Sequence, residues 1–148
     1  MPGSTDVFGA SILIVDDQEC NVRLLEYALR RGGYIAVTST TDPSSVCALH
    51  RQNRYDLILL DLQMPRMNGF EVMADLANEA AVSVLVLSGD PAKMARALEA
   101  GAKDFLSKPF VLTEVLVRVK KMLLHEIEEP VPALATAPAA LAPTRAAF

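Results

Sequence analysis

The sequence predicts an α/β fold in which a parallel β-sheet is covered by helices on both faces. Short apolar runs alternate strictly with amphipathic helical patterns, five times within 148 residues. The central run, residues 57–60 (Leu-Ile-Leu-Leu), has no polar alternation, which is typical of a strand buried on both faces. The chain length suits one domain with a single sizeable core.

Local sequence signals predict the first two strand–helix units. The Ile/Val-rich run 11–15 predicts a strand, and a helix is expected over 18–31, where Val22, Leu25 and Leu29 form one apolar stripe and two glycines follow. The second strand is expected at 34–38. A helix is then expected over 43–52, because Asp-Pro supplies an N-cap and a first-turn proline.

The third strand begins after Tyr55 and ends at or just after Asp61, where Met-Pro and Asn-Gly breakers follow. A helix is expected from residue 68 or 69, with Phe, Val, Met and Leu on its inner side. The remaining expected elements are strands at 81–87 and 103–107 and helices at 91–100 and 111–125.

Composition limits the function classes. A net charge of −4 without a basic patch argues against direct nucleic-acid binding. Residues 1–10 lack a signal-peptide run and no apolar run is long enough for a membrane span, so we expect a cytoplasmic protein with no membrane contact. Cys20 and Cys47 lack metal-ligand spacing and are expected to be reduced core thiols. His50 and His125 are expected on the surface, away from any site.

Three regions are expected along the chain. Residues 1–10 read as a flexible leader and residues 11–126 as the folded domain. Residues 127–148 read as a flexible tail or linker, because residues 130–148 contain four Pro and eight Ala and have little to bury.

Polar side chains follow four of the five expected strands at the point where each strand ends. They are Asp16, Asp17, Asp61, Ser88 and Lys108. A cap or turn role could explain any one of them. In a parallel sheet, however, all these ends lie at one edge, where open α/β sheets bind their ligands. We therefore expect the five side chains to form one site.

This set of groups suits phosphoryl chemistry. Three clustered carboxylates repel one another, and a divalent cation with oxygen ligands, such as Mg²⁺, relieves that repulsion. A lysine and a hydroxyl directed at the same point would neutralise and hydrogen-bond a phosphoryl group. One carboxylate can then act as a nucleophile and form an acyl phosphate.

Four segments together resemble a response-regulator receiver domain of two-component signalling, over roughly residues 11–126. The segments are 12–17 (ILIVDD), 61–69 (DLQMPRMNG), 87–89 (LSG) and 101–110 (GAKDFLSKPF). The resemblance implies a flavodoxin-like, doubly wound, five-stranded parallel sheet of strand order 2-1-3-4-5 with five helices.

The resemblance also assigns roles at the site. Asp61 would be the phospho-acceptor, receiving the group from the phosphohistidine of a sensor histidine kinase or a phosphotransfer protein. Mg²⁺ would be held by Asp17, by Asp61, by the backbone carbonyl of Gln63 and, mostly through water, by Asp16. Such a protein is a switch, not an enzyme in the ordinary sense, since it catalyses only its own phosphorylation and dephosphorylation.

Further roles follow from the same resemblance. Ser88 and Lys108 would contact the phosphoryl oxygens, and Phe105 would occupy the aromatic switch position. The peptide bond between Lys108 and Pro109 resembles the cis bond of the family, which aims the lysine. Gln63 and Asp90 flank the phosphoryl pocket and are expected to tune the lifetime of the phosphoryl group. The output surface would be the fourth helix, fifth strand and fifth helix.

Two features depart from the resemblance or lie outside it. The stretches 69–88 and 88–101 are short for the family, which would reshape the third and fourth helices. Val117 and Leu124 lie seven residues apart on the last helix, opposite its core stripe. We expect them to be exposed and to form a homodimer or effector contact.

Other functions stay open on the sequence alone. The chain could be a phosphorylation-independent interaction module, or the input half of a longer effector, such as a cyclic-dinucleotide enzyme or a DNA-binding regulator. An acyl-phosphate hydrolase is a more distant alternative, because the chain lacks an evident cap domain. The downstream partner would be an effector protein or a fused output domain.

Overall fold

The computed structural model describes residues 7–64, 68–79 and 81–128 of the chain. Five parallel strands form one sheet in the order β2-β1-β3-β4-β5, which confirms the parallel sheet predicted from the sequence pattern and the strand order implied by the family resemblance. The strands are β1 (Ser11–Val15), β2 (Ala36–Thr40), β3 (Leu57–Asp61), β4 (Ser83–Ser88) and β5 (Asp104–Ser107).

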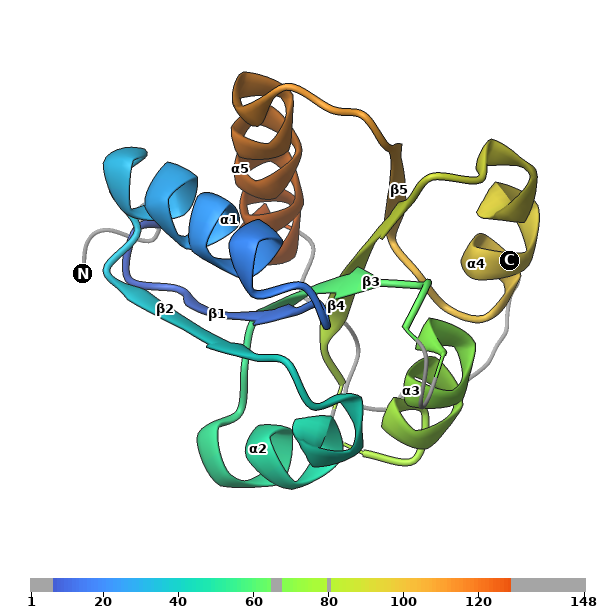
Figure 1. Ribbon diagram of the computed structural model, residues 1–148. Helices are drawn as coiled ribbons and strands as arrows, with labels where there is room; N and C mark the ends of the chain where they lie inside the picture. Colours follow the sequence, from blue (N-terminus) through green and yellow to red (C-terminus); the bar gives the residue numbers. More distant parts are fainter. Residues whose placement is uncertain (1–6, 65–67, 80, 129–148) are drawn as a thin grey trace, which may run out of the picture.

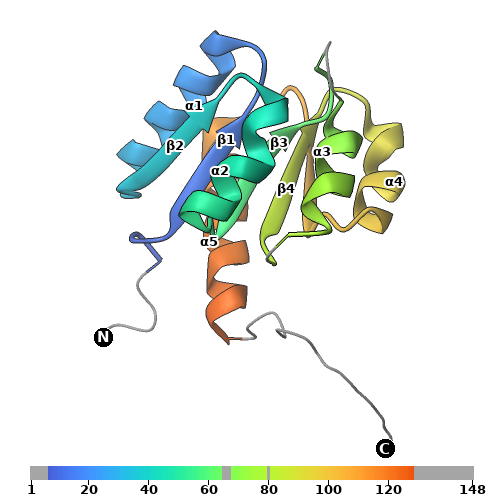
Figure 2. The ribbon, with the colours of Figure 1, turned by 90° about the horizontal axis from the view of Figure 1, so that it is seen from below.

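Five α-helices cover both faces of the sheet. They are α1 (Glu19–Arg31), α2 (Val46–Asn53), α3 (Gly69–Leu76), α4 (Met94–Glu99) and α5 (Leu112–Glu128), with short 3₁₀ turns η1 (Pro43–Ser45) and η2 (Pro91–Lys93) before α2 and α4. In Figure 1, α1 and α5 lie on one face, and α2 and α3 lie on the other. The view in Figure 2 looks onto the second face, with α2, α3 and α4 in front of the strands.

The core consists of two apolar layers separated by the sheet. Successive residues of β3 serve opposite layers: Leu57 and Leu59 pack with α1 and α5, while Ile58 and Leu60 pack with the other helices. All five β3 residues are buried, as the uninterrupted apolar run predicts. Each of the four aliphatic side chains of β3 contributes about 1.5–3 kcal/mol by leaving water, so the central strand is strongly fixed in register.

The second strand begins two residues later than predicted. The chain leaves α1 through Gly33, whose φ of 109° suits glycine, and the Tyr34 N–H donates to the Leu29 carbonyl. The Tyr34 side chain is buried and packs against the Phe8 ring. Residue 34 therefore still belongs to the helix terminus, and extended pairing with β1 starts at Ala36.

Helices α2 and α4 are both shorter than predicted, and the two helices share one cause. Each is preceded by an Asp-Pro pair, and the Asp side chain caps a 3₁₀ turn: Asp42 accepts from the Ser44 N–H and Asp90 from the Ala92 N–H. The first turn of each expected helix is thus 3₁₀, and the α-helices begin at Val46 and Met94. α4 then has only six residues, in line with the short stretch noted in the sequence.

Three expectations about burial are wrong. Residues 7–10 of the expected leader are packed on the domain, with Val7 only 3% exposed in the α1/α5 layer. Cys20 is exposed because it lies off the buried stripe of α1, whereas Cys47 is half-buried and packs against the apolar layer of α2, α3 and α4, as expected. His50 is buried, since its ring stacks on Tyr55 and its Nδ1 accepts the Tyr55 backbone N–H at 3.1 Å.

The prediction for the other histidine is confirmed, since His125 is exposed. Residues 1–6 of the expected leader and 129–148 of the expected tail lie outside the described residues, as does Pro65 of the Met-Pro breaker. Within the described part of the chain, no helix has both the length and the apolar character needed to cross a bilayer.

A capping box fixes the start of α3, directly after the central strand. The Asn68 side chain accepts from the Glu71 backbone N–H, and the Glu71 side chain accepts from the Asn68 N–H, each at 3.0 Å. In Asn68→Ala we expect the free energy of unfolding to fall by about 1 kcal/mol, because one helix donor loses its partner. Urea unfolding measures this. The control Asn78→Ala alters an exposed turn residue and should change stability much less; equal losses would contradict the capping account.

Candidate functional site

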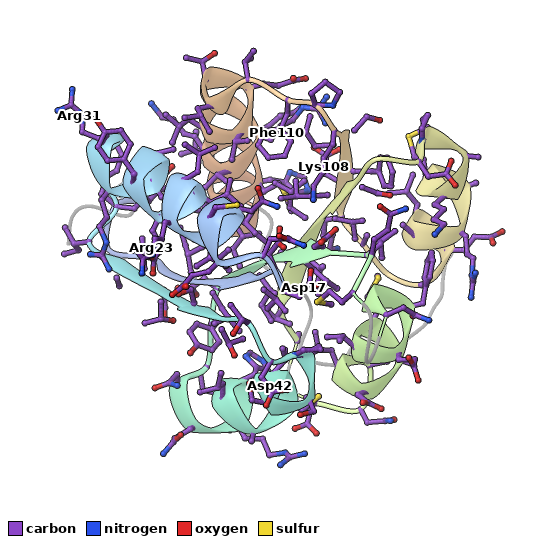
Figure 3. All side chains as sticks on the ribbon, in the orientation of Figure 1. Asp17, Arg23, Arg31, Asp42, Lys108 and Phe110 are labelled. Carbon is purple, nitrogen blue, oxygen red and sulfur yellow. The ribbon has the colours of Figure 1, made fainter. Side chains whose placement is uncertain are left out.

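The predicted site residues meet at the C-terminal edge of the sheet. Asp61 is the last residue of β3, Ser88 the last residue of β4, and Asp16 follows β1 directly. Carboxylate oxygens of Asp16, Asp17 and Asp61 all lie within 4.8 Å of one another. Lys108 follows β5, and Figure 3 labels it together with Asp17 at this edge of the sheet. The structure therefore brings together residues from four strand ends.

Asp16 is almost completely buried, with an exposed fraction of 1%. Its Oδ1 accepts the Gln18 backbone N–H at 2.9 Å. Its Oδ2 is buried and has no hydrogen-bond partner among the described residues, and the nearest cation, Lys108 Nζ, is 3.7 Å away. A buried carboxylate oxygen left in this state is costly unless another positive group approaches it. This observation makes Asp16 a suitable ligand for a cation.

Asp61 is 3% exposed and is held at one of its two carboxylate oxygens. Oδ1 accepts the Gln63 backbone N–H at 3.2 Å and lies 3.4 Å from Lys108 Nζ. Burial raises the pKa of Asp61, and the neighbouring Asp16 raises it further. Lys108 and the Gln63 N–H act in the opposite direction without cancelling the rise. Ionised Asp61 is therefore under electrostatic stress in the metal-free protein.

The three carboxylates fit a hard divalent cation. They offer oxygen ligands from a half-buried Asp17 and two buried partners, so a metal could enter from the solvent side while keeping water ligands. The orphaned Oδ2 of Asp16 and the raised pKa of Asp61 both show that positive charge is lacking here. Asp16, Asp17 and Asp61 could hold such an ion, and the cluster suits Mg²⁺.

Ser88 and Lys108 are placed by β4 and β5. Ser88 is fully buried, its Oγ accepts the Asp90 backbone N–H at 3.1 Å, and its carbonyl accepts the Lys108 N–H at 2.7 Å. The bond between Lys108 and Pro109 is cis, as the resemblance implied. The Lys108 ammonium reaches both Asp16 and Asp61, whereas the Ser88 hydroxyl is engaged with its own loop.

The other predicted residues have more varied positions. Phe105 is 6% exposed, so its ring faces inward, in the layer that includes Ala97 and Val86. The Gln63 side chain is exposed and lies beside Gly89. Asp90 is half-buried and caps η2, so it has a structural role besides any effect on the pocket.

The predicted contact residues on α5 differ from each other. Val117 is 63% exposed, as expected. Leu124 is half-buried and packs against the α1/α5 layer, so the prediction that it is an exposed residue opposite the core is wrong. Both residues still border the same groove along α5, together with Lys120, Lys121 and His125.

Two features that support the site were not predicted from the sequence. Gly69 packs so closely on the Asp61 loop that an added Cβ would lie 2.8 Å from the Leu62 Cα and 2.9 Å from the Asp61 carbonyl oxygen. Arg118 of α5 binds Asp104 of β5 at 2.8 Å and also donates to the Phe105 carbonyl. The Asn-Gly pair could have signalled the first feature. The second joins residues 14 apart, and no local spacing indicates it.

Comparison with known proteins identifies the family. The family model described as the response regulator receiver domain matches residues 12–120. The chain is 38% identical to the transcriptional regulatory protein ResD of Bacillus subtilis, over 76% of this chain and 47% of ResD. It is 37% identical to the Bacillus subtilis alkaline phosphatase synthesis transcriptional regulatory protein PhoP, over 80% of this chain and 51% of PhoP.

A solved structure agrees with the sequence matches. The chemotaxis response regulator CheY4 of Vibrio cholerae superposes with a TM-score of 0.71 at 27% identity, covering 77% of this chain and 98% of CheY4. The chain therefore belongs to the response regulator receiver domain family. It is a receiver domain of two-component signalling, a class of signalling switches rather than classical enzymes. The chain spans about half the length of these two curated relatives.

The electrostatic stress at Asp61 gives a stability prediction. A raised carboxyl pKa means that the folded state binds the proton more tightly than the unfolded chain, so ionised Asp61 destabilises the fold at neutral pH. In Asp61→Asn, without divalent cations, we expect the free energy of unfolding to rise by on the order of 1 kcal/mol near neutral pH. The gain should vanish as pH falls below the ordinary value of 3.8, where the carboxyl is protonated in both states.

Urea unfolding at several pH values measures this gain. The matched control Asp75→Asn removes an exposed carboxylate of α3 and should leave stability nearly unchanged at every pH. Added Mg²⁺ should stabilise the wild type more than Asp61→Asn. A wild type that is more stable than Asp61→Asn near neutral pH without metal would contradict the account.

Proposed function

We propose that Asp61 accepts a phosphoryl group from the phosphohistidine of a sensor histidine kinase or a phosphotransfer protein. The observation that carries the proposal is the buried cluster of Asp16, Asp17 and Asp61 with Lys108 Nζ 3.4 Å from Asp61. Two contacts fall on Asp61 Oδ1, so Oδ2 is the better candidate for the nucleophile. A new P–O bond forms, the P–N bond breaks, and the histidine nitrogen leaves with the bonding electrons.

The neighbouring residues have separate roles in this proposal. Asp16, Asp17, Asp61 and the Gln63 carbonyl hold Mg²⁺, which when bound supplies positive charge beside the transferring group. Lys108 already spans Asp16 and Asp61 and follows the negative charge to the phosphoryl oxygens. Asp61 thereby gains a dianionic group beside the loops that carry the Lys108 ammonium and the Ser88 hydroxyl.

The switch starts from two contacts of the unphosphorylated structure. Ser88 Oγ exchanges its bond with the Asp90 N–H for one with the phosphoryl group, which displaces the loop after β4. Leu87 of β4 pairs with Leu106 of β5, the residue directly after Phe105, and Phe105 packs against Ala97 of α4. A shift of β4 therefore changes the packing of Phe105. The surface of α4, β5 and α5 then presents a second state to a partner, where Val117 and Leu124 are candidate contacts.

Decay of the phosphoryl group follows from attack by water on phosphorus, which the protein catalyses on itself slowly. Gln63 and Asp90 are the proposed tuning residues, because each extends from a loop beside Asp61 or Ser88. Gln63 is exposed and free to reach such a water, whereas Asp90 is held as the η2 cap.

For the output we propose an effector protein or a fused output domain, acting in the cytoplasm. ResD and PhoP are named transcriptional regulatory proteins, and each extends well beyond the matched region. This supports a fused output domain in the native protein, with residues 129–148 after α5 as the linker. The mass of the native gene product tests it: a product no longer than this chain would contradict a fused domain.

Beryllofluoride, which mimics a phosphoryl group, tests the proposed function. With Mg²⁺ present, we expect it to shift amide NMR signals around Asp61 and Ser88 and across α4, β5 and α5. Asp61→Ala should abolish this response, and Lys108→Ala should weaken it at least tenfold, since a charge-assisted contact to the anion is lost.

The control Asp75→Ala should respond as the wild type does. Shifts that persist in Asp61→Ala would contradict the assignment of the acceptor. No response in the wild type would favour a phosphorylation-independent interaction module.

A further inference from the structure

An apolar groove opens between α3, α4 and the start of β4, at the edge of the sheet opposite the phosphorylation site. Its volume is about 360 Å³. Its lining consists of Met73, Leu76, Ala77, Glu79, Ala81, Val82, Val84, Ala100 and Gly101. The groove lies at the C-terminal ends of α3 and α4, since its lining includes Leu76 and Ala77 at the end of α3 and Ala100 directly after α4.

The lining of the groove suits an apolar partner better than a charged one. Glu79 is the lining residue that carries a charge, and Arg51 binds both of its oxygens, at 2.9 and 3.0 Å. Gly101 has φ of 115°, and the space around its Cα is open, so the rim there presents backbone and no side chain. Residues that could fill the groove should be small or aliphatic.

The C-terminal segment of the chain, residues 129–148, has that chemistry. Sixteen of its 20 residues are Ala, Pro, Val, Leu or Phe. It also contains four prolines, and proline limits the conformations open to a free chain, which lowers the entropy lost when a segment lies in a groove. Leu134 and Leu141 are its largest aliphatic side chains.

The segment also starts at the correct edge of the sheet. α5 runs antiparallel to the strands and ends at Glu128, and in Figure 2 it extends past the edge at which β4 begins. Twenty residues span up to about 66 Å when extended, at roughly 3.3 Å each. The whole sheet is about 20 Å wide, since strands lie about 4.8 Å apart. The segment is therefore long enough to pass beneath the sheet and reach the groove on its other face.

We propose that residues 129–148 fold back around the N-terminal edge of the sheet and place Leu134 or Leu141 in the groove between α3 and α4. The contact is intramolecular and covers the apolar surface of the groove. It does not depend on phosphorylation of Asp61.

Tryptophan fluorescence tests the proposal directly, because the chain contains no tryptophan. Leu134→Trp and Leu141→Trp each place one probe in the segment of the full chain. We expect at least one probe to emit at shorter wavelength than the same residue in a free peptide of residues 129–148. Ala81→Asp, which puts a carboxylate on an exposed, non-helical part of the groove, should move the emission to that of the peptide.

Ala95→Asp is the matched control, since Ala95 is exposed on α4 and does not line the groove. It should leave the shifted emission unchanged, and circular dichroism should show all variants folded. Three results would overturn the proposal: peptide-like emission from both probes, a shift that survives Ala81→Asp, or a shift that depends on protein concentration. The last would indicate docking of the segment on a second copy of the chain.

Discussion

Two carboxylates, Asp16 and Asp61, are buried side by side with too little positive charge, and the site depends on this constraint. Lys108 approaches both, yet Asp16 Oδ2 still lacks a hydrogen-bond partner among the described residues, and the pKa of Asp61 is raised by burial and by Asp16. Such a pair is unfavourable alone and becomes favourable when a cation joins it. The same charge imbalance underlies both the predicted cost to stability and the proposed binding of a metal ion and a phosphoryl group.

The fold holds this unfavourable arrangement because the surrounding structure is strongly determined. β3 is buried along its whole length, and Gly69 lets the start of α3 pack directly on the loop after Asp61. On the other side, the cation Arg118 joins α5 to Asp104 and to the Phe105 carbonyl. In the proposed function, a change in charge at Asp61 would be transmitted through β4 and β5 to α4 and α5.

Much of this could be predicted from sequence, because periodicity and strand ends are local signals. The alternation of runs predicted the sheet, and the residues after the strands predicted the cluster of Asp16, Asp17 and Asp61. The errors arise where tertiary packing or turn chemistry decides. Tyr34 and Val7 are buried by contacts between distant segments. His50 is buried because its Nδ1, in place of a backbone carbonyl, accepts the hydrogen bond from the Tyr55 backbone N–H. The Asp-Pro pairs gave 3₁₀ turns where α-helix was expected.

The central claim is that Asp61 is the nucleophile of this cluster, and covalent mapping tests it most directly. The protein would be treated with Mg²⁺ and acetyl phosphate, trapped with borohydride, which reduces an acyl phosphate to an alcohol, digested and sequenced by mass spectrometry. The account predicts one modified residue, homoserine at position 61, formed only when Mg²⁺ and phosphodonor are both present. Modification at Asp16 or Asp17 instead, or none under conditions in which the protein is folded and binds Mg²⁺, would contradict it.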